Sequence, residues 1–277
     1  MNTKQIRDQL EQIFSLYDYE DDIIEIRCIG EITEAEKLYP FSMFAPPWRW
    51  LKDNSPVVRM YGSKKKKNHR SEFVDGGILA LLDLNRRGYN IYFGVNPRRQ
   101  RVEDLLFHGE KRDIERVRVC HADVDSIRPE KVEEILEGAG IKASAIIESN
   151  AQVFGCHVYL AYRESPAMPY PAPDLVAKYE MMNRRFISLF KPDAKADDVQ
   201  DLSRILRVPG VVNWPDARKR SQGREPSPCR LHSCDPDQQY SLEELDALLP
   251  RLSESIWSDA GVEGAVVTEP RQSSKVF

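Results

Sequence analysis

This sequence of 277 residues lacks long apolar runs and a strong excess of one charge, and it holds few cysteines. No stretch approaches the roughly 18 consecutive apolar residues that a membrane-spanning helix needs. The five cysteines are odd in number and widely scattered, which argues against a disulfide framework and favours a reducing, cytoplasmic setting. With 40 Lys and Arg against 44 Asp and Glu, the net charge of −4 excludes a histone-like polycation. It leaves nucleic-acid binding by a local basic groove open.

The N-terminus lacks the apolar core of a signal peptide, and the last twenty residues are poor in aromatics. The first seven residues lead straight into a charged amphipathic segment, so we expect no signal peptide. Residues 258–277 hold a single aromatic, Phe277, which is typical of a disordered tail. The hydrophobic content of 41% is nevertheless enough for a packed core, and the length suits one large domain or two small ones.

Hydrophobic periodicity predicts a mixed α/β protein, with a central sheet flanked by helices. The spacing predicts helices over 3–16, 71–87, 129–137, 174–190, 199–206 and 241–248. It predicts strands over 23–29, 89–95, 117–124, 143–148, 157–162 and 230–232. Ser241 and Glu244 have the spacing of a capping box, which marks the start of the last helix.

Basic residues gather in two segments that are far apart in the sequence. Arg59 to Arg70 holds six bases and no acid, including Lys64–Lys67, and a second basic stretch runs from Arg204 to Arg224. One interpretation is that each basic stretch forms a solvated loop. The other is that the two stretches together line one groove. Trp48 and Trp50 lie upstream of the first stretch, where aromatic rings either pack in the core or stack on bases of a template strand.

A pair of acids, Asp123 and Asp125, ends one of the predicted apolar strands. Residues i and i+2 of a strand point to the same face, so the two carboxylates project together. Such close like charges repel unless a cation lies between them, and hard oxygen ligands suit Mg²⁺ and Mn²⁺. The alternative is that these acids only cap the helix that begins at Pro129.

A histidine, His157, lies inside an apolar strand two residues after Gly155. A glycine in a strand permits the close approach of a ligand to the backbone. The alternative is a core histidine that bonds to backbone groups. Ser149, at the end of the preceding strand, offers a hydroxyl at the same connection.

The segment from Asp197 to Asn213 combines two acids with two arginines. Asp197 and Asp198 precede the predicted short helix, where one can cap it while the other stays available. Arg204 and Arg207 lie three residues apart, on one face of that helix, and guanidinium groups suit bidentate phosphate recognition. An ordinary capped helix with an Asp201–Arg204 pair is the alternative.

Taken in order, these motifs resemble the catalytic domain of the archaeo-eukaryotic primase superfamily, in particular the primase-polymerases of plasmids, phages and mobile elements. Asp123 and Asp125 match its Asp-x-Asp motif, Gly155-Cys156-His157 its small-x-His motif, and Ala196-Asp197 its hydrophobic-Asp motif. Arg204 to Asn213 matches an Arg-x-x-Arg-hydrophobic-Pro-Gly-x-x-Asn segment, and Tyr92 to Arg98 a Tyr-x-x-x-Asn-Pro-Arg pattern. The resemblance covers about residues 20–250.

The resemblance implies a fold and a division of the chain. We expect a primase-polymerase domain over 1–257, with an N-terminal α/β part to about 110 and an RRM-like catalytic part over about 111–250. The sequence departs from the family where Trp214-Pro215 follow Asn213, since many relatives have a lysine there. The nearest bases are Arg218, Lys219 and Arg220. Cys229, His232 and Cys234 lack a fourth ligand for the zinc insert that relatives often carry.

The resemblance further implies DNA-dependent nucleotidyl transfer by a primase or polymerase, with nucleoside triphosphates, a single-stranded template and a primer. Two Mg²⁺ or Mn²⁺ ions would be held by Asp123, Asp125 and Asp197, with Asp198 as an alternative ligand. A second set of residues is assigned to the nucleotide: His157, Ser149, Arg207, Asn96 and Arg98. The sequence lacks a phosphate-loop motif, so a separate helicase chain is expected. A metal-dependent nuclease and a catalytically silent, DNA-binding replication initiator are the alternatives.

Overall fold

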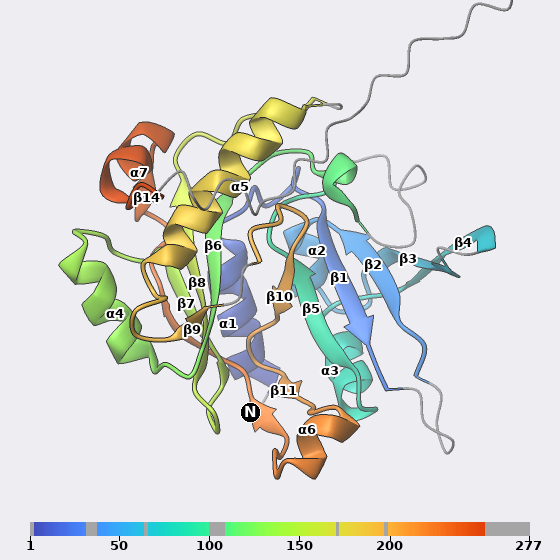
Figure 1. The fold of residues 1–277 in the computed structure, drawn as a ribbon. Coiled ribbons are helices and arrows are strands. Elements are labelled where there is room, and N and C mark those ends of the chain that lie inside the picture. The colour runs from blue at the N-terminus through green and yellow to red at the C-terminus, as the bar shows by residue number, and fades with distance from the viewer. Residues whose placement is uncertain are drawn as a thin grey trace, which may run out of the picture.

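The structure is a computed structural model that describes residues 3–31, 38–63, 66–99, 109–169, 172–196 and 199–252. For 61–63 and 66–71 it describes the backbone alone. The tail expected over 258–277 and the lysines Lys64 and Lys65 therefore lie outside the described residues. Two large sheets, a two-stranded sheet and seven α-helices make up the described chain (Figure 1).

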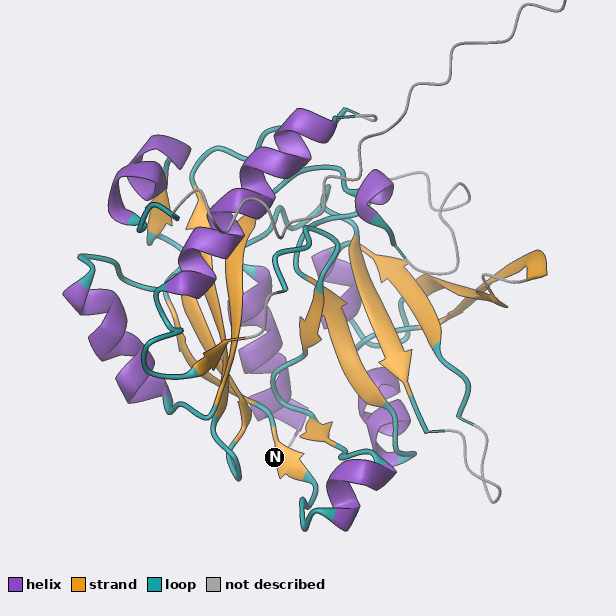
Figure 2. Ribbon diagram, viewed as in Figure 1, coloured by secondary structure: helices purple, strands orange, loops and turns teal. Residues whose placement is uncertain are grey.

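The first sheet has the strand order β10-β5-β1-β2-β3-β4. Its strands are β1 (Ile24–Ile29), β2 (Phe41–Ala45), β3 (Pro56–Ser63), β4 (Lys66–Asp75), β5 (Asn90–Gly94) and β10 (Ile205–Arg207). Helices α2 (Pro47–Leu51) and α3 (Ile78–Arg86) lie behind this sheet in the view of Figure 2, and α1 (Thr3–Phe14) is seen between the two sheets. The other face of the sheet is turned toward the viewer, without a helix across it.

The second sheet has the order β13-β7-β8-β6-β9. It consists of β6 (Val119–Asp125), β7 (Ala145–Asn150), β8 (Gly155–Tyr162), β9 (Lys195–Ala196) and β13 (Arg230–Cys234), and β14 (Gln239–Tyr240) pairs with β8 in parallel. Helices α4 (Pro129–Gly138), α5 (Pro173–Ser188) and α7 (Leu242–Leu248) accompany it. The succession β6-α4-β7-β8-α5-β9 is a β-α-β-β-α-β unit, which is the RRM-like arrangement expected for this half.

Smaller elements complete the fold near the C-terminal end of the described chain. A two-stranded sheet joins β11 (Val212–Asn213) to β12 (Ser227–Pro228), and α6 (Ala217–Ser221) lies between them in sequence. A 3₁₀ helix covers Lys111–Asp113. None of the described helices is long and apolar enough to cross a membrane.

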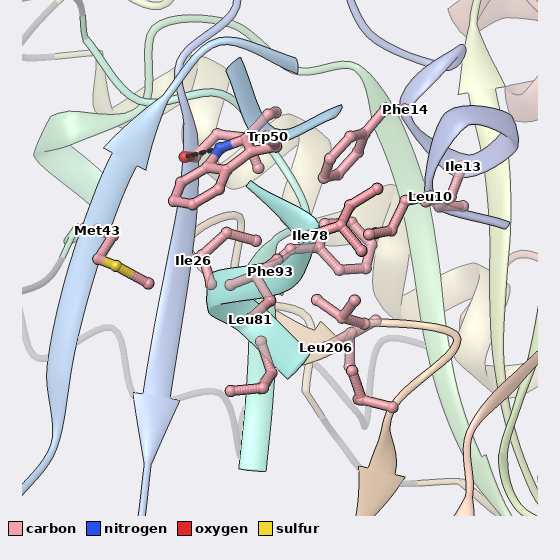
Figure 3. Close-up of a cluster of buried hydrophobic side chains, with 14 of the residues drawn as sticks. Leu10, Ile13, Phe14, Ile26, Met43, Trp50, Ile78, Leu81, Phe93 and Leu206 are labelled. Atoms are coloured by element: carbon pink, nitrogen blue, oxygen red, sulfur yellow. Dashed lines mark hydrogen bonds between the residues drawn. The ribbon is translucent and has the colours of Figure 1, made fainter. Parts of the chain in front are cut away.

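One hydrophobic core spans both sheets, because α1 contacts each of them. Its apolar face, at Ile6, Leu10, Ile13 and Phe14, is buried, as the helical spacing predicts. The cluster around it takes in Phe93 of β5 (Figure 3) and also Tyr159 of β8. A second cluster fills the space between the second sheet and α4, α5 and α7. The N-terminal and catalytic parts expected from the sequence therefore share a core.

Trp50 belongs to that core and not to a nucleic-acid surface. Its side chain is fully buried, and its indole N–H donates to the carbonyl of Ala45 at 3.0 Å (Figure 3). The suggestion that Trp50 stacks on a template base is therefore wrong. Trp48 is only half-buried, with the guanidinium of Arg49 5.0 Å from the centre of its ring.

Two predicted helices are replaced in part by strands. The helix predicted over 71–87 begins only at Ile78, since residues up to Asp75 pair with β3. Gly77, with φ of 90°, separates strand from helix, a conformation that glycine adopts without steric cost. The helix predicted over 199–206 is absent, because Ile205–Arg207 pair with Tyr92–Gly94 instead. In both cases partners distant in sequence outweighed local periodicity.

Candidate active site

The two aspartates of the Asp-x-Asp motif lie side by side on the face of β6 that looks away from α4 and α5. The residues between and before them, Val124 and Ala122, are fully buried in the cluster under those helices. Asp123 and Asp125 must then emerge on the opposite face, because side chains alternate along a strand. Asp123 is partly buried and Asp125 is exposed. The expectation that both carboxylates share one face is confirmed.

His157 lies directly opposite Asp123 in the antiparallel pair of β6 and β8. Its Nε2 atom is 3.6 Å from Oδ1 of Asp123, and its Nδ1 atom is buried without a hydrogen-bond partner within the described chain. Burial, helped by Arg207 and Arg204, holds the pKa of His157 well below its ordinary value. The imidazole is therefore neutral near pH 7, and one of its nitrogens has no partner within the described chain.

Arg204 brings a positive charge close to Asp123. Its guanidinium lies 3.7 Å from Oδ2 of Asp123. Burial raises the pKa of Asp123, while Arg204 and Arg207 act against that rise. The site therefore holds a carboxylate that is costly to ionise in the absence of a cation, which is the environment that favours binding a metal ion or a proton.

Gly155 leaves the floor of the site open. It pairs with Asp125, and a Cβ atom added there would lie 2.8 Å from Oγ of Ser149 and 3.2 Å from Oδ1 of Asp125. Any side chain would therefore displace one of these two groups. Ser149 itself is buried at the end of β7, and its carbonyl accepts from the amide of Asn213. The serine and the glycine are thus placed beside the acid pair.

A cavity of about 420 Å³ joins these groups to a set of cations. Its charged lining consists of Asp123, Asp125, Arg204, Arg207, Arg218, Lys219 and Arg224, and His157, Ser149 and Tyr92 contribute polar groups. Five cations thus face two carboxylates, so the cavity suits a polyanion such as a triphosphate. Buried Nε atoms of Arg204 and Arg207 have no partner within the described chain.

Arg207 is held by an aromatic side chain. It lies directly opposite Tyr92 in the pairing of β10 with β5, and its guanidinium carbon is 5.3 Å from the centre of the tyrosine ring. Guanidinium groups over aromatic faces gain electrostatic stabilisation. The two arginines expected on one helix face in fact come from the loop before β10 and from β10 itself, and both reach the cavity.

Two residues expected at the nucleotide, Asn96 and Arg98, lie instead in the interior. Both are fully buried. Arg98 donates to the carboxylate of Glu25 at 2.9 Å and to the carbonyl of Ser203 at 3.0 Å. Asn96 donates to the carbonyl of Leu202 at 3.1 Å and accepts from the amide of Arg118 at 2.8 Å. Direct contact with a nucleotide is therefore wrong for these two side chains.

The third carboxylate of the expected metal set, Asp197 or Asp198, lies outside the described residues. The strand that leads to it is described: Ala196 at the end of β9 pairs with Val124, the residue between the two aspartates of β6. Within the described ranges, no three Asp, Glu, His or Cys side chains form a metal cluster. Two hard carboxylate donors on one face, together with a cradle that tolerates only glycine, fit a Mg²⁺ or Mn²⁺ ion.

Sequence reasoning missed His121, which lies two residues before Asp123 on the same face of β6. It is fully buried, and burial, followed by the Arg204 charge, lowers the pKa of His121 to about 3. Its place in an alternating strand that ends in two acids was the available signal.

The candidate zinc ligands do not come together: His232 contacts Glu133, while Cys234 donates to the carbonyl of Gln12.

Comparison with solved structures gives a fold for this arrangement. The AEP domain of the primase-polymerase of cyanophage S-2L superposes with a TM-score of 0.53 at 15% sequence identity, covering 88% of this chain and 98% of that one. The chain has the fold of an archaeo-eukaryotic primase domain. The mixed α/β architecture and the primase-like fold that the resemblance implies are thereby confirmed.

The primase RepB′ is a further structural neighbour, with a TM-score of 0.48 at 11% identity over 88% of this chain and 60% of that one. No family model and no curated protein matches the sequence. For this archaeo-eukaryotic primase fold, the chemistry must therefore be argued from the residues of the chain itself.

Proposed function

We propose that this protein is a DNA-dependent nucleotidyltransferase, a primase or DNA polymerase, that joins nucleotides on a single-stranded template during replication of a mobile element. One observation carries the proposal: a carboxylate pair and a neutral histidine open into the same cavity as five cations. The acids suit divalent ions, and the cations suit the triphosphate of the incoming nucleotide.

Asp123 and Asp125 would hold the divalent ions, with Asp197 or Asp198 as the third carboxylate. Bound there, Mg²⁺ or Mn²⁺ lowers the pKa of the primer 3′-hydroxyl and neutralises charge on the phosphates. His157 donates a hydrogen bond to a phosphate oxygen, since its imidazole is neutral and one nitrogen has no partner within the described chain. Arg204 and Arg207 add fixed positive charge where negative charge builds up.

The cations also favour nucleotidyl transfer over the nuclease alternative. A nuclease needs metal-binding acids, but it has no use for a separate triphosphate site. Here Arg218 and Lys219 of α6, together with Arg224, extend the positive lining beyond the acid pair. A pocket lined by this series of cations suits the three linked phosphates of a nucleoside triphosphate.

Primer extension on a single-stranded DNA template tests the proposal. The protein is incubated with labelled primer, Mn²⁺ or Mg²⁺, and either deoxynucleotides or ribonucleotides, and a parallel reaction omits the primer. Extension should require the metal and the nucleotide and should vanish in D123A/D125A. The control E134A/E137A removes two exposed charges from α4, away from the cavity, and should retain activity.

Shortening of the labelled strand without added nucleotides would identify a nuclease instead. Template binding with neither reaction would identify a silent initiator module. Either outcome overturns the proposed activity.

A further inference from the structure

The segment from Val199 to Arg204, called here the strap, connects the two halves of the active site. It follows the acids of the third motif, and it ends at the arginine that contacts Asp123. Its backbone forms no helix and no strand before Ile205. Such a segment depends on side chains and neighbouring strands to satisfy its backbone groups.

One side chain of helix α5 and one of strand β6 hold the first end of the strap. The amide of Asn183 in α5 donates to the carbonyl of Gln200 at 2.8 Å, and its oxygen accepts from the backbone N–H of His121 at 3.2 Å. Nε2 of His121 lies 3.2 Å from the carbonyl of Val199, and Nδ1 lies 3.4 Å from the Asn183 amide. A neutral ring with its proton on Nε2 satisfies both contacts, in agreement with its lowered pKa.

Groups that follow β5 hold the other end. Asn96 donates to the carbonyl of Leu202 and Arg98 to that of Ser203, while the N–H of Val95 donates to the carbonyl of Arg204 at 3.0 Å. Three successive carbonyls, those of Leu202, Ser203 and Arg204, are thus fixed on both sides of the Cα that carries the Arg204 side chain. Arg98 is itself fixed by the buried carboxylate of Glu25.

We propose that Asn96 and Asn183 are positioning residues that fix the strap, and through it set Arg204 against Asp123 and the phosphate cavity. This inference rests on the proposed function for its kinetic consequence. Both asparagines are nearly or fully buried and do not line the cavity, so they act through Arg204 and not on a substrate. A displaced guanidinium loses most of its effect, because catalytic groups need tight placement.

Hydrogen exchange tests the structural part without any need for activity. In Asn96→Ala and in Asn183→Ala, backbone amides over 199–207 should exchange faster than in the wild type, while those of β7 and β8 stay protected. The control is Ser144→Ala, which removes another buried side-chain clamp, one that bonds the backbone of Gln238 and Ala161. It should leave the strap protected. Unchanged exchange over 199–207 in both asparagine variants would overturn the inference.

A kinetic double-mutant cycle tests the link to Arg204. Asn96→Ala alone should raise the nucleotide KM about five-fold, as expected for loss of one hydrogen bond. In an Arg204→Ala background the same substitution should add roughly twofold or less, because groups acting as a unit are non-additive. Full additivity would show that Asn96 only stabilises the fold.

The two tests separate this inference from the proposed function. If the wild type extends no primer, the proposed function fails while hydrogen exchange still decides whether the asparagines fix the strap. If the wild type is active and the strap stays protected in both variants, only the positioning role fails.

Discussion

Asp123 and His157 face each other across neighbouring strands, with 3.6 Å between Oδ1 of the carboxylate and Nε2 of the ring. The pKa of the aspartate is raised and that of the histidine is lowered, both chiefly by burial. The pair therefore contains no imidazolium to neutralise the carboxylate. Positive charge reaches Asp123 from Arg204 instead, and from any ion that binds there.

His157→Ala should reduce catalysis rather than stability. Loss of one hydrogen bond to a charged phosphate costs about 1.5–3 kcal/mol, which is roughly a 10- to 150-fold drop in kcat/KM. His157→Asn, which keeps a nitrogen near the Nδ1 position, should recover part of the loss. Steady-state extension kinetics beside a melting curve measure this. A melting point several degrees lower with unchanged kinetics would return His157 to a purely structural role.

D123A/D125A should abolish extension without lowering the Tm of the metal-free protein at pH 7. A raised pKa for Asp123 means that the folded state binds its proton more tightly than the unfolded state does. At neutral pH the carboxylate therefore costs stability, and its removal relieves that cost. Added Mn²⁺ should raise the Tm of the wild type but not of the double variant. Calorimetry with and without the ion decides, and a large Tm loss in metal-free buffer would contradict the argument.

Alanine in place of two glycines should have different effects: one substitution lowers activity and the other raises stability. Gly155→Ala places a Cβ 2.8 Å from Oγ of Ser149 and 3.2 Å from Asp125, so activity should fall as one of these groups moves. Gly138→Ala, at the end of α4 with open space around it, should stabilise by about 0.5–1 kcal/mol. Extension assays and urea denaturation measure the two effects. Full activity in Gly155→Ala would mean that the floor of the cavity is not used.

The buried ion pair of Glu25 and Arg98 should make the stability of the protein sensitive to low pH and to substitution of either residue. Burial opposes ionisation of Glu25, but Arg98 and Arg27 outweigh it, so its pKa lies below the ordinary 4.5. The stability from this lowered pKa is present above about pH 4.5 and is lost as the pH falls through the folded-state value.

Arg98→Met should cost about 3–5 kcal/mol by leaving a buried charge without its main partner. E25L/R98M should cost less and should depend less on pH below 4.5. Urea titrations between pH 3 and 7 compare the three proteins. A double variant that is less stable than Arg98→Met would contradict the assignment.

Single-stranded DNA binding should survive D123A/D125A and should weaken steeply with salt. We expect basic side chains, not the acids, to make the phosphate contacts. Counterion release gives a log–log slope of about −0.7 for each phosphate contacted on a single strand. Fluorescence anisotropy at several salt concentrations measures the slope. A slope near zero would exclude an electrostatic template site.

The sequence was most informative where chemistry and local geometry coincide. The i, i+2 spacing of Asp123 and Asp125 follows from the period of a strand, and the motif order placed His157 beside them. The roles of Asn96 and Arg98 were misjudged, since a polar motif after a strand looks alike whether it faces a ligand or a neighbouring loop. Only the fold reveals that the carbonyls of Leu202 and Ser203 lie against them.

The same limit explains the errors in secondary structure. Arg204 and Arg207 have helical spacing, yet Ile205–Arg207 form an edge strand because β5 offers unpaired backbone groups more than a hundred residues earlier in the chain. Pairing at that sequence separation leaves no trace in local periodicity. Arg204 and Arg207 nevertheless line the cavity, because their placement depends on the path of the backbone and not on its helical or extended form.

Strand β10 belongs to the first sheet, although the chain reaches it only after leaving β9 of the second. A fragment that stops near residue 110 would keep β5 but expose its edge, and an exposed strand edge promotes aggregation. A fragment that starts there would carry the acids and the arginines, but no strand on which to seat Arg207. Exchange of modules between relatives must therefore move both sheets together, and a split version of this protein should regain function only when its two pieces reassemble around β10.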